Sequence, residues 1–287
     1  MNFKLPVLIF FMLIFSLFSC KKEDTKDFVK QAKIATEYIK AEDNMADMFV
    51  LFHKALHDTT LVNTGEATID SALVLYTQNV GSAGSQFTFD FGNTGISCLD
   101  GKLRKGQITA VLNHPFDQPD ALFTATFTNY MADSLLMQGQ FSYLNTGETV
   151  AGQLKYEIGF EVSFFMEQIK TLTITAQRDI FWKSGYDKPY KPVNHVFVMP
   201  GAASAQYFGF DGSDTPLTTL TTTITTDWII QVSCFNPIKQ GAFEISLNDN
   251  LITEILTGDF IDVDEDGCAD KIIFKNTDNT FGFPYYF

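Results

Sequence analysis

The chain has 287 residues, of which 34 are Asp or Glu and 20 are Lys or Arg, so its formal net charge is −14 at pH 7. An acidic protein repels the phosphate backbone of nucleic acids, which excludes nucleic acid as an expected partner. The 29 phenylalanines, together with many threonines, favour β-sheet over helix.

The first 20 residues have the pattern of an export signal. Lys4 precedes an unbroken apolar run at residues 7–15, and the stretch closes on Leu17-Phe18-Ser19-Cys20. This order of charge, apolar run and small residue is typical of a signal peptide, and the run is too short to cross about 30 Å of hydrocarbon. Residues 17–20 resemble a bacterial lipobox, which implies that residues 1–19 are removed and that Cys20 carries acyl chains such as palmitate. The alternative is an ordinary signal peptide with a cysteine at its cleavage point.

The residues after Cys20 bear on location. Lys22-Glu23-Asp24 resembles the short tag of lysine and acids that directs lipoproteins of Bacteroidota to the outer leaflet of the outer membrane. No aspartate follows Cys20 directly, so the usual signal for retention in the inner membrane is absent. We therefore expect a lipid-anchored outer-membrane protein that faces the cell surface. A charged run after an anchor also serves as a solvated tether, so this tag is a short signal.

A helix is predicted from residue 24 to about residue 57, so that residues 20–60 form a lipidated tether and an amphipathic helix. Good helix formers dominate this stretch, Pro and Gly are absent, and apolar residues recur near helical spacing. A kink near Asp43-Asn44 fits the pattern. His53 and His57 have a spacing that can bind metal, but the glutamate of an H-E-x-x-H motif is missing, so we expect a surface pair.

From residue 67 onwards, apolar residues recur at every second position. Phe87, Phe89 and Phe91, for example, alternate with polar residues, as in a strand with one buried face. Many short runs of this kind, separated by turn signals, predict a mainly β domain over residues 61–287. We expect an antiparallel β-sandwich or an open barrel-like stack, with room for a C-terminal subdomain from about residue 201.

Residues 89–106 form the most distinctive internal stretch, FDFGNTGISCLDGKLRKG. Together with the hairpin at residues 129–139 and the cysteines Cys234 and Cys268, it resembles a group of uncharacterised β-rich surface lipoproteins of Bacteroidota. The resemblance implies a shared architecture and carries no catalytic residues. Lys102, Arg104 and Lys105 make one basic spot here, which is either an anion site or a solvated hairpin tip, and we favour the second.

The sequence alone does not decide which cysteines form a disulfide. With Cys20 assigned to lipid, Cys98, Cys234 and Cys268 remain, and three thiols outside the cytosol permit one disulfide. The pairs 98–234, 98–268 and 234–268 all stay available. We favour Cys234–Cys268, because both residues lie in the C-terminal quarter of the chain.

Residues 262–270 read DVDEDGCAD and contain alternating aspartates around a glycine. Such spacing lets carboxylates converge on one hard cation, so we predict a structural calcium ion bound by Asp262, Asp264, Asp266 and Asp270. The loop resembles the calcium loop between two strands of integrin-type repeats. It lacks the final glutamate of an EF-hand, since Ile273 occupies that position. The alternative is a polar hairpin with solvated acids.

The sequence contains no nucleophile elbow, phosphate-binding loop or dinucleotide fingerprint. We therefore expect a non-catalytic surface lipoprotein with a binding or envelope-structural role, whose partners are the membrane, through its lipid, and a glycan or a protein. One alternative is a glycan-binding accessory protein in which Trp182 and Trp228 stack on sugars. The other is a secreted hydrolase with an unrecognised carboxylate pair.

Overall fold

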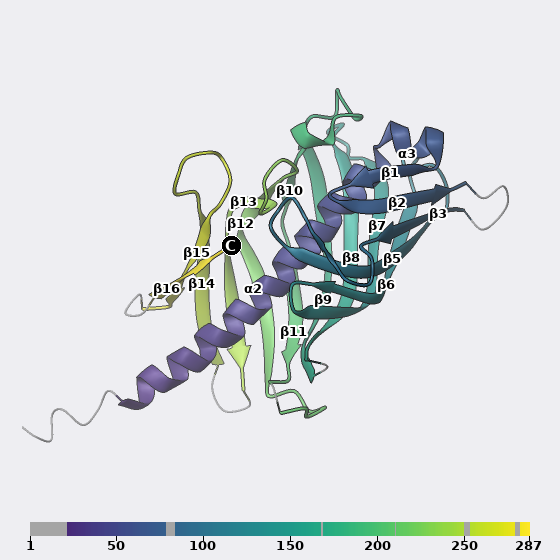
Figure 1. The fold of residues 1–287 in the computed structure, drawn as a ribbon. Coiled ribbons are helices and arrows are strands. Elements are labelled where there is room, and N and C mark those ends of the chain that lie inside the picture. The colour runs from purple at the N-terminus through teal and green to yellow at the C-terminus, as the bar shows by residue number, and fades with distance from the viewer. Residues whose placement is uncertain (1–21, 79–83, 168, 210, 250–252, 279–281) are drawn as a thin grey trace, which may run out of the picture.

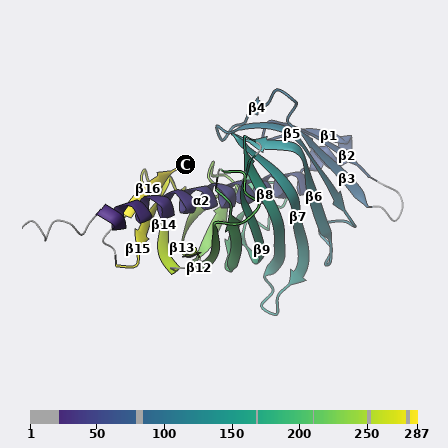
Figure 2. The ribbon, with the colours of Figure 1, turned by 90° about the horizontal axis from the view of Figure 1, so that it is seen from below.

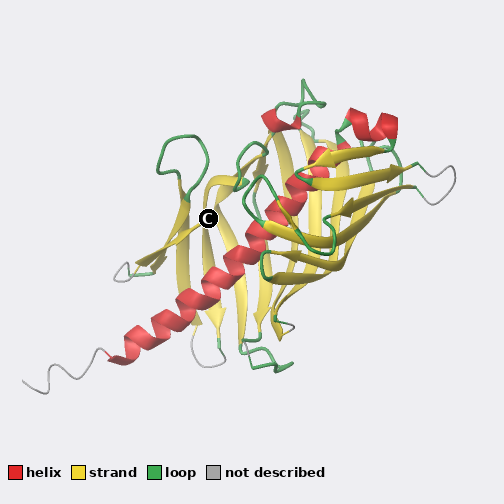
Figure 3. Ribbon diagram, in the orientation of Figure 1, coloured by secondary structure: helices red, strands yellow, loops and turns green. Residues whose placement is uncertain are grey.

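The computed structural model describes residues 22–78, 84–167, 169–209, 211–249, 253–278 and 282–287. Cys20 and residues 1–19 lie outside this part, so the lipobox and its acyl chains stay a prediction. The predicted fold class is confirmed: the protein is mainly β and antiparallel, with one long helix at its N-terminal end (Figure 3). In the part of the chain that is described, no helix combines the length and the apolar character that crossing a membrane requires.

Two α-helices precede the strands. The first, α2 (Lys22–Leu56), is the predicted helix, and it stays helical through Asp43 and Asn44, where the sequence had suggested a kink. The second, α3 (Thr59–Thr64), was not predicted. The side chain of Asp58, read from the sequence as part of a helix end, accepts a hydrogen bond from the Leu61 amide at 2.8 Å and so caps the start of α3. A short 3₁₀ helix, η2 (Pro192–Asn194), lies between two later strands.

The strands of the first half of the sheet are β1 (Glu66–Ile69), β2 (Ala72–Thr77), β3 (Ser85–Asp90), β4 (Ile96–Ser97), β5 (Leu103–Leu112), β6 (Leu122–Ala132), β7 (Leu135–Glu148) and β8 (Leu154–Met166). The strands of the second half are β9 (Ile169–Ser184), β10 (Val196–Met199), β11 (Ala202–Tyr207), β12 (Thr218–Gln231), β13 (Ile238–Asn248), β14 (Thr253–Ile261), β15 (Lys271–Asn276) and β16 (Gly282–Tyr286).

All of these strands belong to one sheet. Its order follows the chain from β1 to β16, except that β4 pairs only with β5, and β11 pairs with β9 and β12 beside β10. The sheet continues through residue 201, where the sequence had left room for a subdomain boundary. Figures 1 and 2 show that it curls, so that β2, β3 and β5 lie on the other side of α2 from β8 and β9.

The core lies between α2 and the inner face of this curled sheet. Phe52 of α2 has ring centroids of Phe89, Phe123 and Phe141 within 5.0–5.3 Å. The predicted alternation is observed in β3, where Phe87 and Phe89 are buried. Since aromatic residues bury a large apolar area, these contacts explain why a chain rich in phenylalanine wraps its sheet around one helix.

Candidate functional site

The middle of α2 is buried on every side. Residues 41–50 are all buried, although Glu42, Asp43, Asn44 and Asp47 lie among them. A helix that is buried all round is normally apolar all round. Buried charges are tolerated only where they are paired, so the partners of these four side chains define the site.

Glu42 is paired with Arg178 of β9. The Arg178 guanidinium donates to both Glu42 carboxylate oxygens, at 2.8 and 2.6 Å, and the Tyr38 hydroxyl donates to the same carboxylate. Burial by itself lowers the pKa of Arg178, but the adjacent Glu42 carboxylate outweighs it and the net shift is upward. A bidentate pair of this kind fixes distance and orientation, so it sets how α2 lies on β9.

Asp43 and Asp47 face the turn that the sequence had marked as a basic spot. Lys102 contacts both of these carboxylates. Arg104 donates to Asp47 at 2.9 Å and to Asp100 at 2.8 and 2.6 Å. The expectation of a solvated hairpin tip is therefore wrong for Lys102 and Arg104: this turn folds over α2, and its cations neutralise the helix acids.

We call Asp43, Asp47, Asp100, Lys102 and Arg104 the acid–base cluster. It has three carboxylates and two cations, so with all groups ionised it carries one excess negative charge. Burial raises the pKa of Asp47 to about 7, and the nearby charge of Asp43 adds to this rise. The positive charges of Lys102 and Arg104 oppose the rise but do not cancel it. Taking up a proton at Asp47 is one way for the cluster to lose its excess charge.

His53 of α2 is inside the protein and His57, the residue just after α2, is partly buried, so the prediction of a surface pair is wrong. His53 is fully buried, and its two ring nitrogens lie 3.2 Å from the Tyr143 hydroxyl and 2.7 Å from Nδ1 of His195. His57 Nδ1 lies 2.9 Å from the His53 carbonyl. Burial lowers the pKa of both His53 and His57, that of His57 to about 4. Neutral rings explain how three histidines are accommodated together.

One stripe of α2 faces a groove instead of the sheet. Residues at helical spacing line it: Lys40, Asp43, Asn44, Asp47, Met48, Leu51 and Lys54. Two cavities occupy this groove, one of about 280 Å³ and one of about 800 Å³. Asp100, Ser233 and Phe235 line both of them, and Phe235 is 71% exposed.

Two residues that line the larger cavity, Asp43 and Asn44, each have one buried acceptor without a partner among the described residues. Asn44 Nδ2 donates to the Lys40 carbonyl at 2.7 Å, which leaves Asn44 Oδ1 as an acceptor. Neither Asn44 Oδ1 nor Asp43 Oδ1 has a hydrogen-bond partner among the described residues, although both atoms are buried. An unpaired buried acceptor costs about 1–3 kcal/mol. Both atoms have almost no accessible surface, so they lie behind the surface of the cavity.

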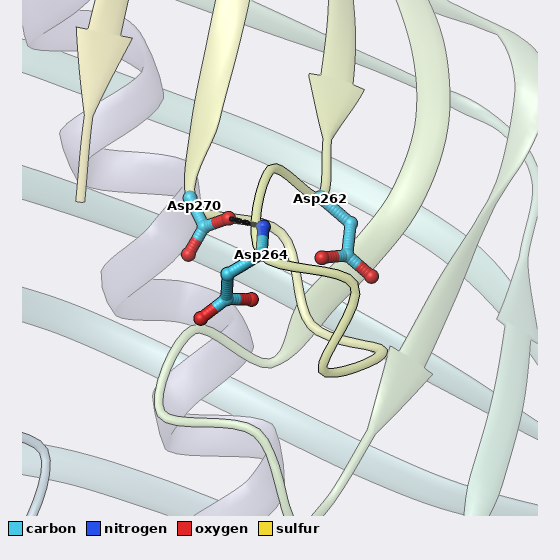
Figure 4. Close-up of side chains that lie close together, drawn as sticks. All are labelled: Asp262, Asp264 and Asp270. Carbon is cyan, nitrogen blue, oxygen red and sulfur yellow. Dashed lines mark hydrogen bonds between the residues drawn. The ribbon is translucent and has the colours of Figure 1, made fainter.

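The acidic loop at residues 262–270 joins β14 to β15. Carboxylate oxygens of Asp262, Asp264 and Asp270 lie within 4.8 Å of one another (Figure 4), so each of these aspartates offers a ligand atom to one cation. Asp266, the fourth predicted ligand, is outside this group; it is exposed and accepts from the Cys268 amide at 2.8 Å. Asp270 Oδ2 accepts from the Val263 amide at 2.6 Å, and such bonds pre-form the loop.

The structure joins Cys234 to Cys268, which is the pairing that the sequence analysis favoured. This disulfide ties the loop after β12 to the acidic loop, and both loops border the larger cavity. Cys98 keeps a free, buried thiol. Trp182 and Trp228 are 4% and 0% exposed, so neither presents the sugar-stacking surface that the glycan-binding alternative required of them.

Sequence reasoning missed Asp43, Asn44 and Asp47 as site residues. The sequence suggested only a kink at Asp43-Asn44 and gave Asp47 no role, whereas all three residues line a groove that other loops close. One signal was present: from Met45 to Phe52 the helix has almost no polar face left, which is typical of a helix that is enclosed.

The chain matches no protein-family model, no curated protein and no solved structure.

Proposed function

We propose that this chain is a lipid-anchored protein of the outer membrane that faces the cell surface and binds a small ligand, without catalysis, in the groove beside α2. The observation that carries the binding role is the larger cavity, which offers about 800 Å³ of space between charged, polar and aromatic side chains. Pockets of this size hold small organic ligands.

The location rests on the sequence. The lipobox-like residues 17–20 and the acidic tag after Cys20 support an acyl anchor on the outer membrane. Because α2 begins at Lys22, this anchor would join directly to the helix around which the sheet is wrapped. The ligand groove would then lie on the element nearest to the membrane attachment.

A binding role is favoured over catalysis by the state of the groove's charged groups. Asp47, Lys102 and Arg104 are held by one another in ion pairs that dock α2. The docking of α2 accounts for these groups, so none of them needs a catalytic role to explain its position.

A structural calcium ion in the 262–270 loop is part of the proposal. Three carboxylates with oxygens within 4.8 Å of one another provide hard ligands, and charge repulsion among them gives a cation a stabilising role. The disulfide at Cys268 would hold this loop beside the groove whether or not a calcium ion is bound.

Location is tested in intact cells. We expect added protease to remove the protein from intact cells, and Cys20→Ala to release it from the membrane fraction. Loss of the protein only after cell lysis would place it on the periplasmic side, and a Cys20→Ala protein that stays in the membrane would contradict the acyl anchor.

Ligand binding is tested by thermal shift against a panel of sugars, amino sugars, diamines and organic acids. At least one class should raise the melting temperature, and Phe235→Ala should remove that rise, because Phe235 borders both cavities and is largely exposed. If no compound in the panel raises the melting temperature, the proposed binding role is wrong.

A further inference from the structure

We propose that the chain has a second binding surface, on the connection from β9 to β10, and that this surface takes an acidic polysaccharide. Its residues are Lys183, Tyr186, Lys188, Tyr190 and Lys191, which we call the β9–β10 surface. None of them lines either cavity of the groove, so the surface is independent of the small ligand proposed above. The inference rests on open ring faces, unpaired positive charge and a backbone that holds both in place.

Two aromatic rings of this surface are open to solvent. Tyr186 and Tyr190 are 61% and 60% exposed. Seven of the ten tyrosines in the chain are buried or half-buried, so two exposed ones in one short connection are unusual for this protein. A tyrosine combines an apolar ring face with a polar hydroxyl, which suits the apolar face and the hydroxyl edge of a sugar ring.

The positive charge of the surface is also unengaged. Lys183, Lys188 and Lys191 are exposed, and none of them forms an ion pair within the described residues, whereas Lys155 on the neighbouring strand is paired. Asp187 is the one acid in residues 183–193, so three lysines and one aspartate leave two excess positive charges on a chain of net charge −14. Since salt screens charges beyond about 8 Å, these lysines dominate the attraction at this surface.

The backbone that carries these side chains is tied into consecutive turns. The Lys188 amide donates to the Gly185 carbonyl at 3.0 Å, and the Lys191 amide donates to the Lys188 carbonyl at 2.8 Å. Gly185 has a φ of +91°, and a side chain there would meet backbone atoms, so the first turn depends on glycine. Pro189 and Pro192 fix two further φ angles.

The same connection is anchored to the core through His195. His195 is fully buried, and its Nε2 lies 3.1 Å from the Lys188 carbonyl, which can only accept. Nε2 therefore carries the proton, and Nδ1 accepts from His53 Nε2 of α2 at 2.7 Å. A loop that is held in this way loses little conformational entropy when it binds a ligand.

The backbone also indicates which kind of polyanion fits. The amides of Lys188, Lys191 and Asn194 donate within the connection. Pro189 and Pro192 have no amide hydrogen to donate. An acidic peptide that binds by strand pairing would thus find no row of free donors. A polysaccharide with a charge on its sugar rings instead uses side chains alone, and its rings and charges match the mixture of tyrosine and lysine.

The test is calorimetric titration of the full lipidated chain in nonionic detergent, with chelator present so that calcium does not bridge acidic groups. The probes are oligogalacturonate, its uncharged methyl ester, chondroitin sulfate and polyglutamate. We expect at least one of the two acidic glycans to bind ten-fold or more tightly than both the methyl ester and polyglutamate. Its affinity should fall as salt is raised, because exposed charges are screened.

Variants connect binding to the proposed contacts, and all of them change exposed side chains. Lys188→Gln/Lys191→Gln should weaken the acidic glycan at least ten-fold and reduce the salt dependence, because two charge-assisted contacts are lost. Tyr190→Ser should weaken it several-fold through the loss of a ring face.

Each change has a matched control. Lys30→Gln/Lys33→Gln removes the same charge from exposed positions near the start of α2, and Tyr286→Ser removes a ring that is 63% exposed on β16. Both should bind the acidic glycan as the parent chain does.

The outcomes separate this inference from the proposed function. If neither acidic glycan binds, or if the methyl ester or polyglutamate binds equally well, the polysaccharide inference is overturned. Equal losses from the variants and their controls would place the glycan elsewhere and also overturn it. A ligand found in the thermal panel would still support the groove, and Phe235→Ala, which removes that ligand, should leave glycan binding unchanged.

Discussion

The carboxylates of α2 and those of the 262–270 loop are neutralised in different ways. Glu42, Asp43 and Asp47 are buried and paired with cations that lie far away in the sequence, on β9 and on the turn before β5. Asp262, Asp264 and Asp270 are partly or fully exposed, and their carboxylates accept hydrogen bonds from backbone amides of their own loop. The first set depends on the complete fold, whereas the second is arranged within nine consecutive residues.

This difference indicates which charged residues determine the stability of the contact between α2 and the sheet. Removing one partner of a buried pair leaves an uncompensated charge, which costs far more than the pair contributes. Removing one carboxylate from an exposed loop leaves the remainder solvated. We therefore expect large effects on unfolding from the α2 pairs and small, cation-dependent effects from the loop.

The largest effect is expected from Arg178→Met. It leaves Glu42 buried without its bidentate partner, and breaking a buried pair costs about 3–5 kcal/mol of unfolding free energy. Urea unfolding followed by circular dichroism measures it. The double variant Glu42→Leu/Arg178→Met should recover much of the loss, because it buries no unpaired charge.

A matched control lies on β9 and its neighbour β8. Lys155 and Asp179 form an ion pair at 2.9 Å, but about a third of each side chain is exposed. Lys155→Met should therefore cost at most about 1 kcal/mol. Equal losses from Arg178→Met and Lys155→Met would mean that burial does not distinguish these pairs.

The next effect concerns pH and the buried histidines. Burial lowers the pKa of His57 to about 4, below the value of about 6.5 expected in the unfolded chain. Between these values the unfolded state binds a proton that the folded state does not. His57 therefore contributes stability that is fully present above pH 6.5 and is lost as pH falls towards 4, up to about 3 kcal/mol.

His57→Gln should remove this dependence. The difference in unfolding free energy between His57→Gln and the parent chain, measured in urea at pH 7, 5.5 and 4, should move in favour of the variant as pH falls. Asp47 acts in the opposite direction: its raised pKa adds stability below about 4 that is lost as pH rises towards 7. It is present in both proteins and cancels in the difference. Parallel pH profiles would contradict the buried, neutral His57.

The sequence predicted the fold class through local patterns. Helix formers without Pro or Gly predicted α2, and alternating phenylalanines such as Phe87 and Phe89 predicted antiparallel strands. Both patterns act over a few residues, so one sequence suffices to recognise them. The curl of the sheet around α2 was not predicted, because it depends on how all the strands twist together.

The groove could not be predicted for a related reason. Glu42 meets Arg178 across 136 residues, and Lys102 meets Asp43 across 59. A charge on a helix has the same appearance in the sequence whether water or a distant cation balances it. The acidic loop was easier to recognise because its aspartates are neighbours along the chain, yet even there the sequence assigned Asp266 to a group that the structure forms without it.

The smallest effect is expected from removing calcium. Extracellular sites of this type bind with dissociation constants of about 10⁻⁴–10⁻³ M, so chelation after millimolar calcium should lower the melting temperature by about 2–4 °C. Asp264→Asn should abolish this sensitivity, because Asp264 belongs to the three-carboxylate group.

Asp266→Asn is the control that makes the calcium test specific to geometry. It removes the same charge from the same loop, but Asp266 lies outside the group whose oxygens converge. The melting temperature of Asp266→Asn should therefore still fall when chelator is added. If Asp264→Asn and Asp266→Asn lose the sensitivity to chelator equally, calcium binding depends only on the total charge of the loop. The proposed coordination by Asp262, Asp264 and Asp270 is then wrong. If the parent chain melts identically with and without chelator, the loop is held by its amide bonds and the Cys268 disulfide without an ion.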